Sequence, residues 1–462
     1  MRKRILKRGS NEGEKRDEHD CADAQEFCED GCGTAATATI LERTVLWSLA
    51  QAAASDRVRF AVIGTGTRGC ELLRASRSVP FAECVAVSDL YDSRHDAARE
   101  TLGHDVPATR DYREILNRKD VDAVLVAIPD HQHRRVVVDA CAAGKDVYCE
   151  KPMSHNVEDG FAIVDAVRQH NRILQVGSQR VSNIVYAKAK EIWDSGALGE
   201  VTFIEGCSGR NSASGAWVYP IPPDANEQTI DWNAFLGDAP KRPFDAARFF
   251  RWRCFADYGE GLSGDLFVHL LSGIHFITGT NQAPEKAQSA GGLYRWKDGR
   301  DFPDLIETLY DYPNFRVALR CNLNNAAGEP IKFYGTKGTM ELDGNTLTFV
   351  PQDTRPQPEG YSLIGWPSRL KTAYFAQWYA EHPGAAPGTT TVGEGETFTA
   401  PQGYSDVVDH EAVFFEAVRS RKPVVENEHF GNVTAIGCHM ANAAYFRGSA
   451  VQWDEASRKI GA

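Results

Sequence analysis

Three groups of residues have the types and spacing that cofactor binding or catalysis requires. The stretch VIGTGTRGC carries a Gly-x-Gly-x-x-Gly pattern at residues 64–69, and Lys151 stands before a proline in VYCEKPMSH. Asp265 and His269 are four residues apart in GLSGDLFVHLLSGIHF. A glycine loop can receive a phosphate, a lysine can stabilise a negative oxygen, and an acid next to an imidazole can support proton transfer.

The glycine pattern stands directly after an apolar, strand-like run and at the start of a helical stretch. In that context the glycines permit a tight turn and close approach of a pyrophosphate, whose charge sits at the helix N-terminus. The next strand-like run, VAVSD, ends in Asp89, where an acid can accept a bond from a ribose 2′-hydroxyl. We therefore expect NAD as the cofactor, with NADP less favoured. The alternative is a glycine-rich turn in a doubly wound domain that binds no dinucleotide.

The position of Lys151 depends on which strand precedes it. In a sheet of order 3-2-1-4-5-6 the stretch DVYCE is the fifth strand, and its carboxyl end lies beside the crevice near the nicotinamide half of the cofactor. Pro152 permits a cis peptide bond and fixes the backbone around the lysine. The alternative is a surface lysine in an ordinary strand-to-helix turn.

The elements that must position these residues fall into two patterns. From Arg57 to about Gly177, short apolar strands alternate with helices, which indicates a parallel sheet covered on both faces. After the helix in NIVYAKAKEIWDSGALG, alternating segments joined by turns indicate a mostly antiparallel sheet, followed by late helices. We predict an α/β fold with an N-terminal Rossmann doubly wound parallel sheet and a C-terminal α+β domain with an open sheet. The predicted parts are a tail (1–56), an NAD-binding domain (57–178) and a substrate and oligomerisation domain (179–462).

Composition and charge exclude several classes of protein. With 462 residues two domains are expected, and a net charge of −12 argues against nucleic-acid binding. No run of 18 apolar residues exists, so no membrane span is predicted. The 11 cysteines are odd in number and most lie in apolar patterns, which is typical of a reducing compartment. We expect a cytoplasmic protein, although residues 43–55 have the character of a leader core and leave export as the alternative.

Metal binding has little support in the sequence. The spacing of the polar residues in the tail matches no common zinc finger, and a disordered tail is the favoured interpretation. The residues in question are His19, Cys21, Cys28 and Cys32. No metal site is predicted.

Several stretches together resemble one family. AVIGTGTRG, VAIPDHQH, AGKDVYCEKPMS and DSGALGEV are similar to the Gfo/Idh/MocA family of NAD(P)-dependent oxidoreductases, which includes glucose–fructose oxidoreductase and inositol 2-dehydrogenase. The similarity extends from about Arg57 to the C-terminus. It implies catalysis by Lys151, Asp265 and His269. The chain departs from many relatives at Ser272, where they carry an acid. The cofactor-binding residues that we expect are Gly64, Thr65, Gly66, Thr67, Arg68, Gly69, Asp89, Pro129, His133, Glu150 and Lys151.

The helical spacing of Asp265 and His269 predicts that they stack on one face. We expect Asp265 to accept a bond from one imidazole nitrogen and to fix the tautomer of His269. The alternatives are two ligands of a metal, without an evident third, or a buried pair with a structural role only. Residues expected to contact substrate are Gln179, Arg180, Arg253 and His275, the last of which could equally be a packing residue.

The expected function is that of an NAD-dependent oxidoreductase acting on a secondary hydroxyl of a sugar, cyclitol or related polyol. One alternative is an NAD-retaining glycosidase that oxidises its sugar transiently and eliminates the aglycone. A further alternative is a non-catalytic NAD- or sugar-binding protein. A carbohydrate is the expected small-molecule partner. We also expect a homo-oligomer, a dimer or tetramer, formed through the open face of the second sheet.

Overall fold

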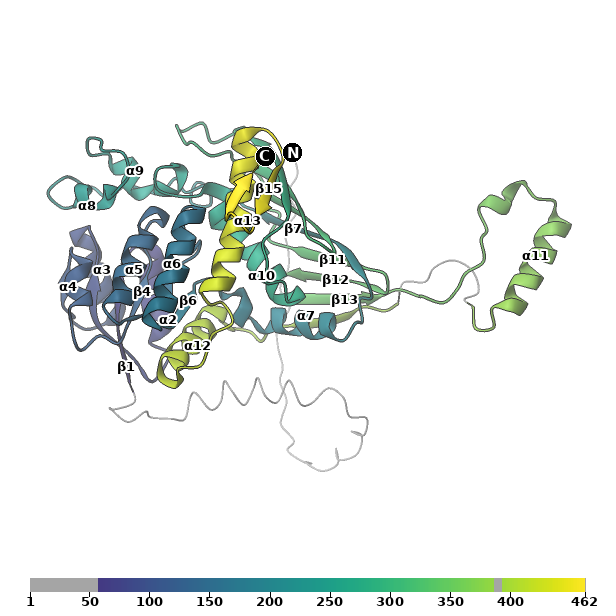
Figure 1. The fold of residues 1–462 in the computed structure, drawn as a ribbon, viewed down its shortest axis with the longest axis horizontal. Helices are drawn as coiled ribbons and strands as arrows, with labels where there is room; N and C mark the ends of the chain where they lie inside the picture. The colour runs from purple at the N-terminus through teal and green to yellow at the C-terminus, as the bar shows by residue number, and fades with distance from the viewer. Residues whose placement is uncertain (1–56, 386–392, 462) are drawn as a thin grey trace, which may run out of the picture. The chain divides into compact units, whose positions relative to one another are not determined.

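The computed structural model describes residues 57–385 and 393–461 (Figure 1). The first sheet has six parallel strands in the order β3-β2-β1-β4-β5-β6, which confirms the predicted order. All four side chains of β5 are buried, as expected for a strand covered on both faces. The strands are β1 (Val58–Ile63), β2 (Ala82–Ser88), β3 (Ala108–Thr109), β4 (Ala123–Val126), β5 (Asp146–Cys149) and β6 (Leu174–Val176).

Helices between these strands cover the parallel sheet. Asn156 accepts a bond from the N–H of Asp159 and so caps the N-terminus of α6. The late helix α12 (Asp406–Ser420) packs on α2 and β1, so the C-terminal part of the chain completes the cover of the N-terminal sheet. The helices of this part are α2 (Thr67–Ser76), α3 (Asp92–Leu102), α4 (Tyr112–Leu116), α5 (His133–Ala142) and α6 (Val157–His170).

The second sheet has ten strands in the order β14-β13-β12-β11-β7-β10-β9-β8-β15-β16. Its strand pairs are antiparallel except for β7 with β10, which confirms a mostly antiparallel sheet. The strands are β7 (Val201–Gly209), β8 (Lys286–Gly292), β9 (Leu305–Asp311), β10 (Arg316–Asn322), β11 (Ile331–Gly335), β12 (Gly338–Asp343), β13 (Thr346–Pro351), β14 (Glu396–Thr399), β15 (Val451–Asp454) and β16 (Lys459–Gly461).

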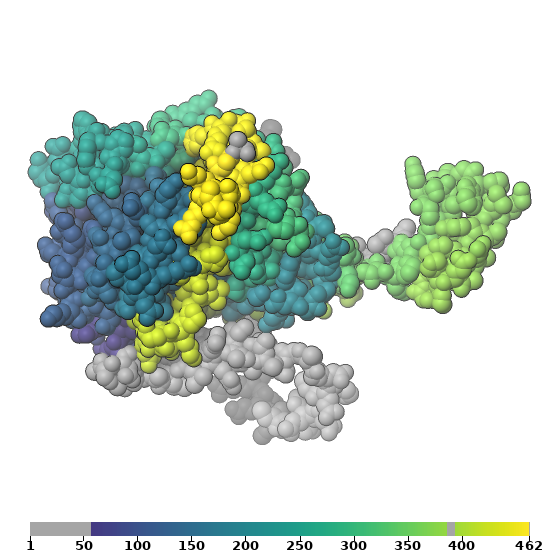
Figure 2. Space-filling model, viewed as in Figure 1, coloured from purple at the N-terminus to yellow at the C-terminus, as the bar shows by residue number. Residues whose placement is uncertain are grey.

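Helices cover one face of the second sheet. The side chains of β9 alternate, with Ile306 and Tyr310 buried and Glu307 and Leu309 exposed, so the opposite face is open. Helix α13 packs on β8 and also on α6 of the first sheet, so it joins the two halves. Figure 2 shows its yellow surface between the blue and the green atoms. The covering helices are α7 (Ile184–Asp194), α10 (Val268–Thr278) and α13 (Glu428–Arg447).

An aromatic insertion between β7 and α10 reaches the end of the parallel sheet. It contains α8 (Trp232–Leu236) and α9 (Ala246–Phe250), and a backbone bridge joins Tyr91, after β2, to Ile230. Tyr91 packs edge-on against Phe250 with ring centroids 5.5 Å apart. The insertion therefore forms one wall above the carboxyl ends of the strands.

The segment Thr354–Pro401, whose role the sequence left unassigned, includes a helix that was not predicted. It contains η6 (Ser362–Gly365), α11 (Ser368–Glu381) and β14. None of the α11 side chains is buried. Within the described ranges, no helix combines the length and apolar character that crossing a membrane requires. The predicted tail, including the leader-like stretch and the four polar residues weighed for zinc, lies outside the described residues.

Candidate active site

The glycine loop joins β1 to α2 at the carboxyl end of the parallel sheet. Gly64 has φ +92°, and a Cβ there would lie 2.3 Å from the carbonyl oxygen of Ala127. A Cβ on Gly69 would lie 2.0 Å from the carbonyl oxygen of Gly64. Only glycine fits at both positions, and the turn leaves the backbone at the start of α2 open to a ligand. This cradle fits the pyrophosphate of a dinucleotide.

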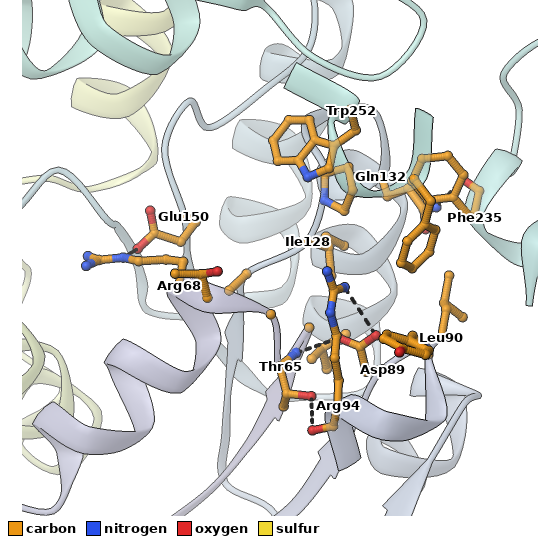
Figure 3. A pocket seen from close by; sticks show the side chains of 18 of the residues that line it. Thr65, Arg68, Asp89, Leu90, Arg94, Ile128, Gln132, Glu150, Phe235 and Trp252 are labelled. Carbon is orange, nitrogen blue, oxygen red and sulfur yellow. Dashed lines mark hydrogen bonds and ion pairs between the residues drawn. The ribbon is translucent and has the colours of Figure 1, made fainter. Parts of the chain in front are cut away.

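Asp89 fastens this loop. Its carboxylate accepts bonds from the N–H groups of Thr65 at 2.7 Å and Tyr91 at 3.0 Å. The guanidinium of Arg94 lies 3.4 Å from the same carboxylate. Figure 3 shows the side chains of Thr65, Asp89 and Arg94 together. Asp89 thus positions the loop in addition to its expected contact with a ribose.

A cleft of about 1440 Å³ runs from the glycine loop to the second domain. It brings together most of the predicted residues from both halves of the chain. Gly69 closes the turn beneath the loop and does not line the cleft. The predicted residues along its wall are Gly64, Thr65, Gly66, Thr67, Arg68, Asp89, Pro129, Glu150, Lys151, Gln179, Arg253, Asp265 and His269.

Glu150 forms an ion pair with Arg68. The Arg68 Nε donates to Glu150 Oε1 at 2.6 Å, and the Glu150 side chain is 7% exposed (Figure 3). A Cβ on Gly177 would lie 2.7 Å from the same oxygen, so a larger residue there would displace this carboxylate. The buried carboxylate holds the arginine beside the loop, and both side chains line the cleft.

Lys151 is held by Asp265. The Lys151–Pro152 peptide is cis, and Lys151 Nζ donates to Asp265 Oδ1 at 2.8 Å and to its carbonyl oxygen at 2.9 Å. An ammonium has three donors, so one stays available to a substrate. The Asp265 carboxylate also accepts from Arg253 Nε and Trp217 Nε1, each at 3.0 Å. Burial alone would raise the pKa of Asp265, but the charges of Lys151 and Arg253 hold it well below its usual range.

The predicted bond between Asp265 and His269 is absent among the hydrogen bonds of the described residues. The Nδ1 atom of His269 is buried without a partner there. Residues 263–267 form a π-helical turn (η5) before α10, and the Asp265 carboxylate is bonded there to Lys151, Arg253 and Trp217. The expectation that Asp265 fixes the tautomer of His269 is therefore wrong, and Asp265 positions Lys151.

His269 lies in a field that keeps it neutral. Burial lowers the pKa of His269 well below 6.5, and the positive charges of Lys151 and Arg180 lower it further. A neutral imidazole that lines the cleft can accept a proton.

Two predicted histidines are not in the cleft. His133 was expected to bind cofactor, but it is buried, with Nδ1 2.9 Å from the Pro152 carbonyl oxygen and Nε2 3.0 Å from that of Ile128. It ties the end of β4 to the segment after Lys151. His275 was expected to contact substrate, but it is buried against the Tyr312 hydroxyl, 2.7 Å from its Nε2. It is six residues after His269 and faces the core.

Arg180 also lies behind the cleft wall, contrary to its predicted substrate contact. Its Nη2 donates to Glu329 at 2.9 Å. Conversely, Arg210 and Tyr219 line the cleft and were not predicted, because they lie in the irregular stretch after β7. A single sequence gives no signal for them.

Comparisons with known proteins agree with this geometry. A family model described as "Oxidoreductase family, NAD-binding Rossmann fold" matches residues 58–178. Inositol 2-dehydrogenase 1 of Saccharopolyspora erythraea is 33% identical over 36% of the chain and 50% of its own length. The match assigns residues 58–178 to the Gfo/Idh/MocA oxidoreductase family. This part of the chain is the NAD-binding Rossmann domain of that family.

Other relatives extend the similarity beyond the matched domain. An uncharacterized oxidoreductase of Streptococcus pneumoniae is 25% identical over 66% of the chain and 77% of its own length. The inositol 2-dehydrogenase match spans only about half of that relative, so it does not compare whole proteins. The solved structure of levoglucosan dehydrogenase in complex with NADH and levoglucosan has a TM-score of 0.62 at 17% identity, over 86% of this chain and 99% of that one. The two proteins share the fold.

Proposed function

We propose that the protein is an NAD-dependent dehydrogenase that oxidises or forms a secondary hydroxyl of a sugar, cyclitol or related polyol. The observation that carries the proposal is that Lys151 and His269 line the same cleft as the glycine loop. Two relatives named for oxidising such compounds, an inositol 2-dehydrogenase and a levoglucosan dehydrogenase, support the substrate class.

The residues of the N-terminal sheet fit the cofactor. The loop of residues 64–69 and Arg68 would hold the pyrophosphate, and Asp89 would accept a bond from the adenosine ribose. NAD, when bound, supplies the hydride acceptor or donor of the reaction. The protein has to hold the hydroxyl and move its proton.

His269 and Lys151 divide this work. In the direction of oxidation, His269 takes the proton of the hydroxyl, which its low pKa permits because the imidazole is neutral. The remaining donor of Lys151 Nζ binds the same oxygen and stabilises its developing negative charge. Asp265 holds the lysine in place through two of its three donors. In the reverse direction, His269 returns the proton.

The test is a panel of polyols, sugars and glycosides, assayed with NAD for NADH formation and for aglycone release. NADH that forms in proportion to substrate consumed would support the proposal. Aglycone release without net NADH would support the redox-neutral glycosidase instead. Absence of both from a protein that binds NAD would favour the non-catalytic alternative.

A further inference from the structure

At the substrate end of the cleft, cationic side chains outnumber the carboxylates with which they form ion pairs. Two pairs of cations each share one carboxylate: Lys151 with Arg253 on Asp265, and Arg180 with Arg210 on Glu329. Asp406 lies 3.8 Å from Arg180 and is the third acid of this group. These ion pairs join four cations to three carboxylates, and Arg180, Glu329 and Asp406 of this group lie behind the cleft wall.

Asp130, which also lines the cleft, does not restore the balance. It is buried, and burial raises the pKa of Asp130 well above its usual range. The nearby charge of Arg253 opposes this rise without cancelling it. The Asp130 carboxylate accepts a bond from the N–H of Glu260 at 3.2 Å, and among the described residues it forms no ion pair with any of the four cations.

Arg253 has donors that the protein does not use. Its Nε is engaged with Asp265 at 3.0 Å, and its guanidinium carbon lies 4.2 Å above the ring of Trp252. These two contacts fix the plane of the guanidinium. Neither Nη group donates to any residue in 57–385 or 393–461. A rigid fork with free donors faces the cleft.

Arg210 is held still more loosely. Its nearest acid is Glu329 at 3.5 Å, and that carboxylate is already bonded by Arg180 at 2.9 Å and by the Ser208 hydroxyl at 3.0 Å. The Arg210 guanidinium makes no hydrogen bond to the part of the chain that the structure describes. Its side chain is 34% exposed and lines the cleft together with Lys151 and His269.

Guanidinium donors that the protein leaves without an acceptor in a cleft are available to bind an acceptor on a ligand. A neutral sugar hydroxyl can accept a bond but cannot neutralise the charge, whereas a carboxylate does both and matches the planar fork. We propose that the substrate of this dehydrogenase is a sugar acid, such as a hexuronate, whose carboxylate is bound by Arg210 and Arg253. This inference rests on the proposed function and narrows its substrate class.

The test compares matched substrates that differ in the acid alone. D-glucose, D-galactose and D-mannose are assayed beside D-glucuronate, D-galacturonate and D-mannuronate, with NAD and at low salt. We expect at least one hexuronate to exceed its neutral partner by about a hundredfold in kcat/KM, on the scale of charge-assisted bonds. Salt should raise the KM of the acid but not that of the neutral sugar.

Variants locate the effect. Arg210→Gln should lower kcat/KM for the hexuronate about 10-fold to 100-fold, mainly through KM, and by at least tenfold more than for the neutral sugar. Arg320→Gln is the matched control, at an exposed arginine on β10 that pairs with Glu307 at 3.6 Å. It should leave kcat/KM unchanged for both the hexuronate and the neutral sugar. The Kd of NAD should be the same in both variants and the wild type.

Each other outcome has a defined meaning. NADH from the neutral sugars without preference for any hexuronate overturns the sugar-acid inference and leaves the dehydrogenase intact. A rise in the Kd of NAD in Arg210→Gln also overturns the sugar-acid inference, because Arg210 would then bind the cofactor. A preference for glucose 6-phosphate over every hexuronate overturns the carboxylate assignment. Absence of NADH with every substrate overturns the inference together with the proposed function.

Discussion

Replacing Lys151 by alanine separates a catalytic lysine from a structural one. Lys151 Nζ donates twice to Asp265 and keeps one donor for the substrate oxygen. Its removal leaves the Asp265 carboxylate with Arg253 and Trp217, each at 3.0 Å, so the buried acid still has partners. The glycine loop and Asp89 lie on other strands and lose no contact with this change.

These contacts set the expected magnitudes. Loss of one preorganised donor to a developing oxyanion should lower kcat about 10²–10³-fold. Leaving a buried charge without any partner costs about 3–5 kcal/mol of unfolding free energy. In Lys151→Ala the Asp265 carboxylate keeps one cation and one indole donor, so we expect this variant to lose about 1–2 kcal/mol. The Kd of NAD should stay within about twofold, which corresponds to a fraction of a kcal/mol.

Lys145 provides the matched control. It precedes the same strand, β5, at its other end, and its Nζ donates to the carbonyl oxygens of Arg118 at 2.7 Å and Val121 at 2.8 Å. Lys145→Ala also deletes a partly buried ammonium with two acceptors, so it should lose comparable stability and keep normal turnover. The measurements are NADH formation, NAD titration and thermal unfolding of both variants.

One result would refute the reasoning. If Lys151→Ala lost stability as Lys145→Ala does, while turnover per NAD-loaded enzyme stayed normal, Lys151 would be structural. The proposed mechanism would then lack its oxygen-binding group. Loss of NAD binding in Lys151→Ala would equally contradict the assignment.

The remaining predictions concern proton transfer, cofactor choice, pH and assembly. His269→Ala should lower kcat about 10²–10⁴-fold, and high pH should restore part of the activity because hydroxide can replace the base. The double variant with Lys151→Ala should lose less activity than the two single losses multiplied together, because both residues act on one hydroxyl. Independent losses in kcat would argue for separate roles. NAD should bind more tightly than NADP, because the Asp89 carboxylate would repel a 2′-phosphate. If titrations with the two cofactors showed tighter binding of NADP, Arg94 would be assigned to the 2′-phosphate. The free energy of unfolding should fall as the pH drops from 6.5 towards 4. Burial lowers the pKa of three histidines to about 4, so these side chains bind protons in the unfolded chain at a higher pH than in the folded protein. Urea titrations that show constant stability between pH 6.5 and 4 would contradict this prediction. These histidines are His131, His275 and His410. Light scattering at micromolar concentration should show a dimer or tetramer formed through the open sheet face, and a monomer would exclude this.

Much of the cofactor side follows from the sequence because its signals are local. A glycine pattern between a strand and a helix specifies the turn by itself, as the close approach of Gly64 to Ala127 shows. Strand order then places the end of β5, and with it Lys151, beside the cleft. These steps need only nearest neighbours in the chain and a general rule of topology.

Only the tertiary structure decided which partners the proposed catalytic side chains have. Asp265 and His269 have helical spacing in the sequence, but the acid is bonded to Lys151, which is 114 residues away. His275 has the same residue type as His269, yet the packing of α10 against α13 buries it beside Tyr312. Which side chain meets which depends on contacts between distant segments, and these are set by how whole elements pack. The free donors of Arg210 and Arg253 come together in the same way, because Arg210 follows β7, Arg253 lies in a 3-10 helix before α10, and both line a cleft that forms only when the two halves have folded together.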